Sequence, residues 1–114
     1  MSVQVTNRVV GDVSVVDVAG RITLGEGASA LRENIRGLVG KGNKKILLNL
    51  GDVSYIDSSG IGELVSGFTT VTNQGGVLKL LGLTKRVKDL LQITKLYTVF
   101  EVFDDEATAV RSFA

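Results

Sequence analysis

The 114-residue sequence contains no cysteine, no histidine and no proline. Without cysteine it cannot form a disulfide scaffold, a thiolate zinc site or a cysteine nucleophile, and nothing suggests an oxidising compartment. Without histidine it lacks the commonest general base near neutral pH and the commonest transition-metal ligand. These absences exclude many classes of enzyme. Because proline is absent, the turns must depend on the 14 glycines together with asparagine and aspartate.

The sequence also has no large excess of one charge and no long apolar run. Its 13 basic and 12 acidic residues give a formal net charge of +1, which argues against a nucleic-acid partner. The longest apolar stretch, residues 46–48, is far shorter than the roughly 20 residues that cross a bilayer. We therefore expect neither export nor membrane insertion, and predict a cytoplasmic protein whose partners are proteins.

The composition is typical of a chain that folds around an aliphatic core. Hydrophobic residues make up 44% of the sequence and aromatic residues only 5%. A core of this kind needs no disulfide or metal, and its length suits one ordinary domain. No linker or repeat divides the chain, so we predict a single domain over residues 1–114.

Strand-like and helix-like patterns alternate along the sequence. Strands are predicted over a run ending at Val10 and over residues 12–19, 45–50, 77–81 and 99–103. Helices are predicted over residues 28–38, 58–71 and 84–91, and over a short segment starting at residues 104–106. The strand over residues 45–50 is short and apolar, so we expect it at the centre of the sheet, ending at Gly51-Asp52. This order predicts an α/β fold with a mixed, largely parallel sheet of about five strands and about four helices.

The most informative segment is residues 53–64, Val-Ser-Tyr-Ile-Asp-Ser-Ser-Gly-Ile-Gly-Glu-Leu. A strand should end and a helix begin there, with Asp57 or Ser58 capping the free backbone N–H groups. Capping does not explain Gly60 and Gly62, since glycine inside a helix costs about 1 kcal/mol relative to alanine. The small residues could permit close packing on a neighbouring element. Alternatively, they could leave the Ser58 hydroxyl accessible to another protein and to phosphorylation.

Other chemical interpretations of the sequence have less support. An enzyme that used Asp57 and Ser58 directly would lack a histidine, cysteine or nearby paired lysine to activate the serine. The glycines at residues 25–27 and 40–42 lack the spacing of a phosphate-binding loop and are interpreted as turns. The basic residues within 85–88 are interpreted as a solvated helix face. We predict a protein that is not an enzyme and that has no metal or cofactor.

The segment Ile56-Asp-Ser-Ser-Gly-Ile-Gly62 resembles the signature of the STAS domain, which anti-sigma factor antagonists share with sulphate transporter tails. The resemblance covers nearly the whole chain. It extends through segments in the family's order, at residues 20–22, 46–50, 75–76 and 87–94 and at Leu96, Val99 and Phe100. It implies that Ser58 is phosphorylated by the partner, an anti-sigma factor that is itself a serine kinase and that binds the ATP.

This resemblance implies a partner-switching regulator. The unphosphorylated protein would bind the anti-sigma kinase and free a sigma factor, phosphorylation of Ser58 would release the complex, and a phosphoserine phosphatase would reset the protein. The residues expected to contact the partner are Asp57, Ser58, Ser59, Gly60, Ile61, Gly62, Thr23 and Glu26. An alternative is an adaptor subunit of a membrane transport complex or of a sensory scaffold, with no phosphorylation cycle.

The sequence departs from the family at one position. Many antagonists have an aspartate two residues beyond a Gly-x in the loop before the first helix, where this chain has Thr23. A partner contact made by that acid is therefore absent here, and Glu26 is the nearby acid that could substitute for it.

Overall fold

The chain begins with an antiparallel hairpin of β1 (Val3–Val10) and β2 (Val13–Ile22) in the computed structural model, which describes residues 3–114. Gly11 makes the turn with a φ of 64°, a conformation that glycine adopts without strain. The sheet continues with β3 (Lys45–Ile56), β4 (Val77–Leu81) and β5 (Val102–Phe103), each parallel to its predecessor. The strands lie side by side in chain order. The predicted α/β fold with a mixed, largely parallel sheet is confirmed.

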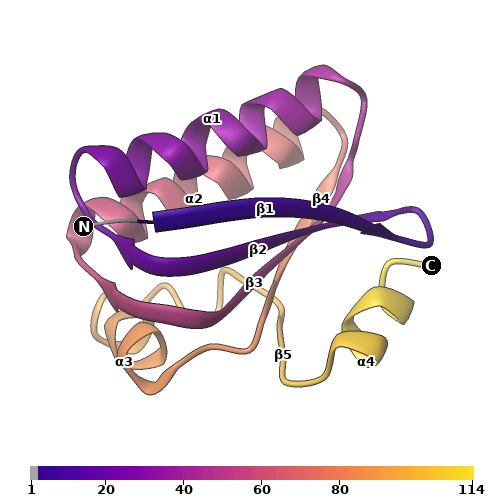
Figure 1. The fold of residues 1–114 in the computed structure, drawn as a ribbon. Coiled ribbons are helices and arrows are strands. Elements are labelled where there is room, and N and C mark those ends of the chain that lie inside the picture. The colour runs from indigo at the N-terminus through magenta and orange to yellow at the C-terminus, as the bar shows by residue number, and fades with distance from the viewer. Residues whose placement is uncertain (1–2) are drawn as a thin grey trace.

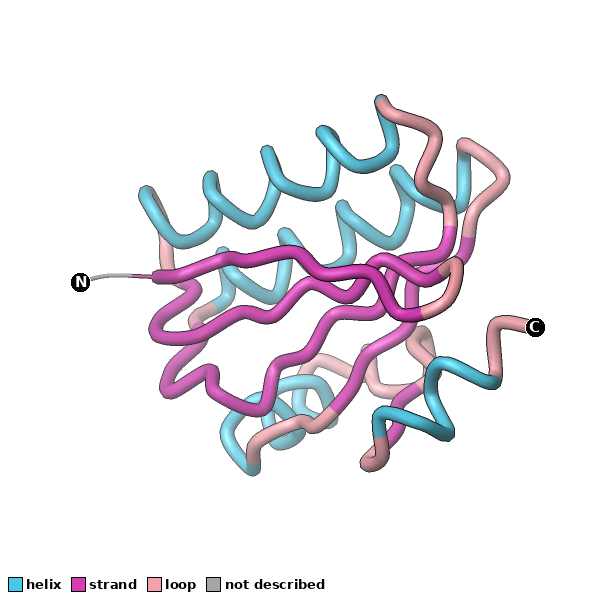
Figure 2. The backbone as a smooth tube through the Cα atoms, turned by 45° about the vertical axis from the view of Figure 1, so that its right-hand side comes forward, coloured by secondary structure: helices cyan, strands magenta, loops and turns pink. Residues whose placement is uncertain are grey.

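Four helices connect and cover the strands. They are α1 (Glu26–Gly40), α2 (Ser58–Asn73), α3 (Lys85–Ile93) and α4 (Glu106–Arg111). Figure 1 shows α1 and α2 running next to each other over one face of the sheet, with α3 and α4 on the other side. The turned view in Figure 2 shows the same two layers and separates α3 from α4. None of the helices within residues 3–114 has both the length and the apolar character needed to cross a bilayer.

The core consists of two apolar clusters, and the larger one also includes Val87 and Leu91 of α3. The larger one joins β2 and β3 to α1 and α2, whose buried residues recur at helical spacing, as in Leu31, Ile35 and Leu38 of α1. The smaller one lies beneath α4, where Ala109 and Phe113 pack against residues of β2, β3 and β4. β3 lies at the centre of the sheet, as predicted.

The bounds of three strands differ from the sequence prediction, and β2 ends at Ile22 rather than at residue 19. β3 does not end at Gly51-Asp52 but continues to Ile56, and its register with β2 shifts at two places to accommodate the extra residues. The Asn49 side chain stabilises the first irregularity, because its Oδ1 accepts a hydrogen bond from the Gly51 N–H at 3.2 Å. This extension brings Tyr55 opposite Arg21 and leads the chain directly into the turn before α2.

The last strand is shorter than the predicted range of residues 99–103, because only Val102 and Phe103 pair with β4. Before it, the chain turns at Lys95, which has a positive φ of 63°. Phe100 packs instead of pairing: it is buried and meets Phe68 edge to face, with ring centroids 5.4 Å apart. The apolar pattern there reflects core packing, which sequence periodicity does not distinguish from a short strand.

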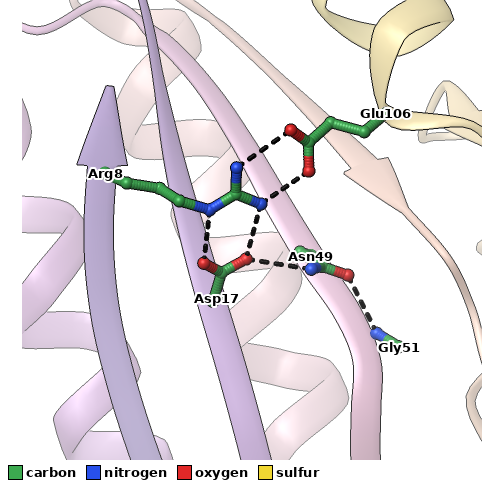
Figure 3. Close-up of polar contacts among 5 residues, drawn as sticks. All are labelled: Arg8, Asp17, Asn49, Gly51 and Glu106. Carbon is green, nitrogen blue, oxygen red and sulfur yellow. Dashed lines mark hydrogen bonds and ion pairs between the residues drawn. The ribbon is translucent and has the colours of Figure 1, made fainter. Parts of the chain in front are cut away.

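A polar network attaches α4 to the sheet. Figure 3 shows the Arg8 guanidinium of β1 between two carboxylates, Asp17 of β2 and Glu106 of α4. Its Nε lies 2.6 Å from Asp17 Oδ2, and its Nη1 lies 2.9 Å from Glu106 Oε2. Asn49 Nδ2 donates to Asp17 Oδ1 at 2.9 Å. Hydrogen bonds from Arg8 hold the pKa values of both carboxyl groups below their usual range.

Candidate functional site

The first turns of α1 and α2 meet at the carboxyl end of β2, and two glycines make this approach possible. A Cβ on Gly27 of α1 would lie 2.4 Å from the carbonyl oxygen of Arg21. A Cβ on Gly60 of α2 would lie 2.3 Å from the carbonyl oxygen of Ile22 and 2.5 Å from Ile56 Cγ1. Both helices can therefore start against the backbone of the same strand end only because these positions are glycine.

Asp57 joins the two helix starts, and the structure identifies it, rather than Ser58, as the N-cap of α2. Its Oδ1 accepts a hydrogen bond from the Gly60 N–H at 2.9 Å, and its Oδ2 accepts one from the Leu24 N–H at 3.2 Å. Partial burial raises the pKa of Asp57, but the N–H groups of Gly60, Leu24 and Ser59 outweigh this effect and hold the pKa below its usual range. The carboxylate therefore fixes the loop before α1 against the turn before α2.

Ser58 is the first residue of α2 and is exposed, while Ser59 is half-buried. Gly62, one turn further along, is also exposed, and a Cβ there would meet nothing within 4 Å. The two glycines of the signature thus have different roles, because Gly60 permits close packing and Gly62 leaves open surface. The packing explanation is confirmed at Gly60, whereas access of another protein to Ser58 past Gly62 stays a prediction.

Two members of the predicted partner-contact set lie in the interior. Ile61 is only 4% exposed and belongs to the larger core cluster, and Gly60 is buried against β2. Neither residue offers appreciable surface to another protein, so their direct role is to hold the turn in place. Glu63, two residues further on, is half-buried, and its Oε2 accepts a hydrogen bond from Arg32 Nη2 of α1 at 2.8 Å. Its negative charge is therefore paired within the fold.

The loop between β2 and α1 lies against the Ser58 turn and contains a residue that the sequence analysis missed. Thr23 is half-buried, and its carbonyl oxygen accepts a hydrogen bond from the Ala28 N–H at 3.0 Å. Glu26 is exposed at the first position of α1. Between them, Leu24 is 79% exposed although its backbone N–H is bonded to Asp57. Only the structure reveals this exposed leucine, because an isolated apolar residue in a loop carries no pattern.

The arrangement favours recognition over catalysis. Within residues 3–114, no group of three or more acidic side chains is placed to hold a metal ion. The side chain next to Ser58, Asp57, is engaged with backbone N–H groups, so it is not directed at the serine hydroxyl as a base would be. The site is an exposed hydroxyl on a rigid turn, next to a small-residue surface and an exposed leucine.

Comparison with known proteins supports this description. A family model described as the STAS domain matches residues 4–109. An anti-sigma-B factor antagonist of Bacillus subtilis (strain 168) is 39% identical over 87 residues, which are 76% of this chain and 78% of that protein. This relative is named as a regulatory protein rather than as an enzyme.

Solved structures show the same fold. The crystal structure of an anti-sigma factor antagonist from Mycobacterium paratuberculosis has a TM-score of 0.85 at 18% identity, covering 98% of this chain and 94% of that chain. SpoIIAA of Bacillus matches in its unphosphorylated form (TM-score 0.71, 97% and 96% coverage) and in its phosphorylated form (0.75, 99% and 100%), each at 19% identity. At these identities the likeness concerns the fold alone.

Proposed function

Since the chain belongs to the STAS domain family, we propose that it is an anti-sigma factor antagonist that is switched by phosphorylation of Ser58. In the proposed cycle, the unphosphorylated protein binds an anti-sigma factor that is a serine kinase and thereby frees a sigma factor. Phosphorylation of Ser58 by that kinase, which supplies the ATP site, ends the complex, and a phosphoserine phosphatase restores the binding form. The proposal places the protein in the cytoplasm, where sigma factors act.

The observation that carries this proposal is the exposure of Ser58 on a turn that is otherwise fixed. Asp57 is held by backbone N–H groups from two loops, and Gly60 packs against β2, so the position of the Ser58 backbone is well defined. The open surface at Gly62 and the exposed Leu24 give a partner room and an apolar contact close to the hydroxyl. An accessible hydroxyl whose backbone is already held in place can be oriented in a kinase active site at a smaller entropic cost.

The proposed contact surface consists of the exposed and half-buried members of the predicted set, together with Leu24. It comprises Thr23, Leu24, Glu26, Asp57, Ser58, Ser59 and Gly62. A phosphate on Ser58 adds about −1.5 to −2 charge at pH 7 in the middle of this surface. Burying such a hydrated dianion against the partner is costly, whereas the helix start on which it lies tolerates anions. The modification should therefore abolish binding without unfolding the protein.

A direct test is to incubate the protein with its cognate anti-sigma kinase and ATP, and to locate the modification by mass spectrometry. We expect one phosphate, on Ser58, and none on the Ser58→Ala variant. Ser59→Ala is the matched control, because it removes the neighbouring hydroxyl and should still be phosphorylated. Phosphate on another residue, or an equal yield from Ser58→Ala, would overturn the assignment of the acceptor.

The same variant separates the switch from a non-switching adaptor. In cells, Ser58→Ala should leave an antagonist locked in its binding form, with the sigma factor constantly active. An adaptor would tolerate the substitution without a change in sigma-dependent transcription, which a reporter gene measures. An enzyme that used Ser58 as nucleophile would instead lose hydrolysis of an activated ester in the same variant.

A further inference from the structure

Two arginines stack on one tyrosine close to the Ser58 turn. The Cζ atom of Arg21, on β2, lies 4.7 Å from the centroid of the Tyr55 ring. The Cζ atom of Arg86, in the first turn of α3, lies 4.5 Å from the same centroid. Contacts of this kind are favourable because the face of an aromatic ring is negative. The β2–β3 pairing directly opposes Arg21 and Tyr55, and α3 brings Arg86 to the same ring.

The positive charge of this Arg21–Tyr55–Arg86 cluster has no acidic partner. Within residues 3–114, neither guanidinium makes an ion pair or a hydrogen bond to a carboxylate, whereas Arg8 and Arg32 both do. Both cluster arginines are exposed. The ring moderates the repulsion between two like charges but does not neutralise it. The cluster therefore has the electrostatic character of an anion-binding pair, with two guanidinium groups that can donate to a phosphate.

Two backbone connections place the cluster near Ser58, the proposed phosphoacceptor. Tyr55 precedes Ser58 by three residues, so their Cα atoms are at most about 10 Å apart. Arg21 precedes Ile22, whose carbonyl oxygen accepts a hydrogen bond from the Asp57 N–H at 3.3 Å. Two carboxylates near the turn are already engaged, since Asp57 accepts from backbone N–H groups and Glu63 pairs with Arg32. Glu26, at the start of α1, is an exposed carboxylate beside the same turn. On α3, Lys85 pairs with Asp89 at 2.8 Å, whereas Arg86 has no carboxylate partner within residues 3–114.

We propose that Arg21 and Arg86 bind the phosphate when Ser58 is phosphorylated. While the serine is unmodified, both guanidinium groups stack on the Tyr55 ring, which keeps them close to the turn. The inference rests on the proposed phosphorylation of Ser58 and adds the consequence of the modification inside this chain. When the phosphate is present, a guanidinium leaves the Tyr55 ring to pair with it. The modification then alters the packing between β3 and α3 as well as the charge at the start of α2.

The test uses full-length protein in which phosphoserine is incorporated at position 58 during translation, so that it does not depend on any kinase. The second pKa of the phosphate is measured by ³¹P NMR in this protein and in its Arg21→Gln/Arg86→Gln variant. The ordinary value is about 6. We expect a lower value in the protein with both arginines and a rise of about one unit in the variant, because an opposite charge nearby favours the dianion.

Two further variants control for other causes. Arg36→Gln removes an exposed arginine in the middle of α1, ten residues from its start, and should leave the phosphate pKa unchanged. Arg21→Lys/Arg86→Lys retains both charges and should keep the pKa low. Since α2 begins at the same residue in every variant, the effect of the helix start is constant and the differences report the arginines. The signals of the Tyr55 ring should shift on phosphorylation with both arginines present, and much less in Arg21→Gln/Arg86→Gln.

The outcomes of these experiments test phosphate binding by Arg21 and Arg86 separately from the proposed antagonist function. An unchanged phosphate pKa in Arg21→Gln/Arg86→Gln would overturn it. A second arm titrates inorganic phosphate into unphosphorylated protein, and binding there without an effect on the phosphoserine would identify a free-phosphate site and also overturn it. The proposal would also be overturned if Arg21→Gln/Arg86→Gln bound the anti-sigma factor more weakly without any change in the phosphate pKa. The cluster would then be a partner contact. The proposed function fails separately, if unphosphorylated protein does not bind the anti-sigma factor.

Discussion

At the residue scale, the signature segment separates into residues that build the turn and residues that face outward. Gly60 and Asp57 hold α2 against the end of β2 and against the loop before α1, through close backbone contact and two hydrogen bonds. Ser58 and Gly62 leave the hydroxyl accessible. Three substitutions, Gly60→Ala, Gly62→Ala and Asp57→Asn, test this division through their effects on stability.

The two glycines should respond in opposite directions to the same substitution. Gly60→Ala forces a methyl group into the carbonyl oxygen of Ile22 and should lower the free energy of unfolding by roughly 2 kcal/mol. Gly62→Ala meets no atom and should raise it by up to about 1 kcal/mol, because alanine favours the helix. Urea denaturation followed by circular dichroism measures both changes. Equal effects of the two substitutions would contradict the assigned roles.

Asp57 should make stability depend on pH. Its pKa is held low in the folded protein, so its contribution is fully present above the unfolded value of about 3.9 and is lost as the pH falls through the folded value. Asp57→Asn removes the charge and keeps one acceptor oxygen for the Gly60 N–H, but its amide nitrogen cannot accept from the Leu24 N–H. The substitution should cost about 1 to 2 kcal/mol at pH 7. The difference in unfolding free energy between wild type and variant should shrink as the pH falls from 5 towards 2. A difference that does not vary over this range would contradict the role given to the carboxylate.

At the element scale, the sequence predicts elements better than it predicts their ends. The spacing of Leu31, Ile35 and Leu38 predicted α1, and Thr84 correctly marked the start of α3, where its Oγ1 accepts from the Val87 N–H. The Gly51-Asp52 pair suggested a turn but lies at a register irregularity inside β3, since pairing with β2 overrides local turn chemistry. Such pairing depends on residues about 30 positions away, which periodicity does not detect.

The attachment of α4 depends on the Arg8 network and is the element-scale prediction. α4 has only six residues, so its helix is too short to be stable without tertiary contacts. Arg8→Gln removes both ion pairs, and amide hydrogen exchange in α4 should accelerate by about fivefold, which corresponds to about 1 kcal/mol. Lys45→Gln removes a comparable pair with Asp12 at the hairpin, and should leave exchange in α4 unchanged. Equal exchange in α4 of wild type and Arg8→Gln would contradict this account.

At the scale of the whole molecule, the order of the strands determines which segments meet at the Ser58 turn. Two helices start where β2 ends, and the sheet order places the turn after β3 directly beside that end. The sequence motif indicated the proposed phosphoacceptor, Ser58, but it could not indicate Leu24 or the Arg21–Tyr55–Arg86 cluster. The cluster comes together only when β2, β3 and α3 have assembled. Arg86 belongs to a basic run that the sequence analysis interpreted as a solvated helix face.

We expect the backbone framework to be the same in both proposed states and the changes to be confined to side chains near Ser58, including the proposed movement of an arginine from the Tyr55 ring. Ser58 lies outside both core clusters, and phosphate at a helix start is compatible with the fold. A hundredfold change in affinity requires only about 2.7 kcal/mol, which the desolvation of one dianion can supply. No refolding is needed for such discrimination.

The most direct test of the central claim is a calorimetric titration of the cognate anti-sigma factor with two forms of this protein. One form is unmodified, and the other carries phosphoserine at position 58. We expect tight binding of the unmodified form and binding at least about 100-fold weaker for the phosphorylated form, with the thermal unfolding of the two forms nearly the same. Equal affinity of the two forms for the anti-sigma factor would contradict the claim that Ser58 is the switch.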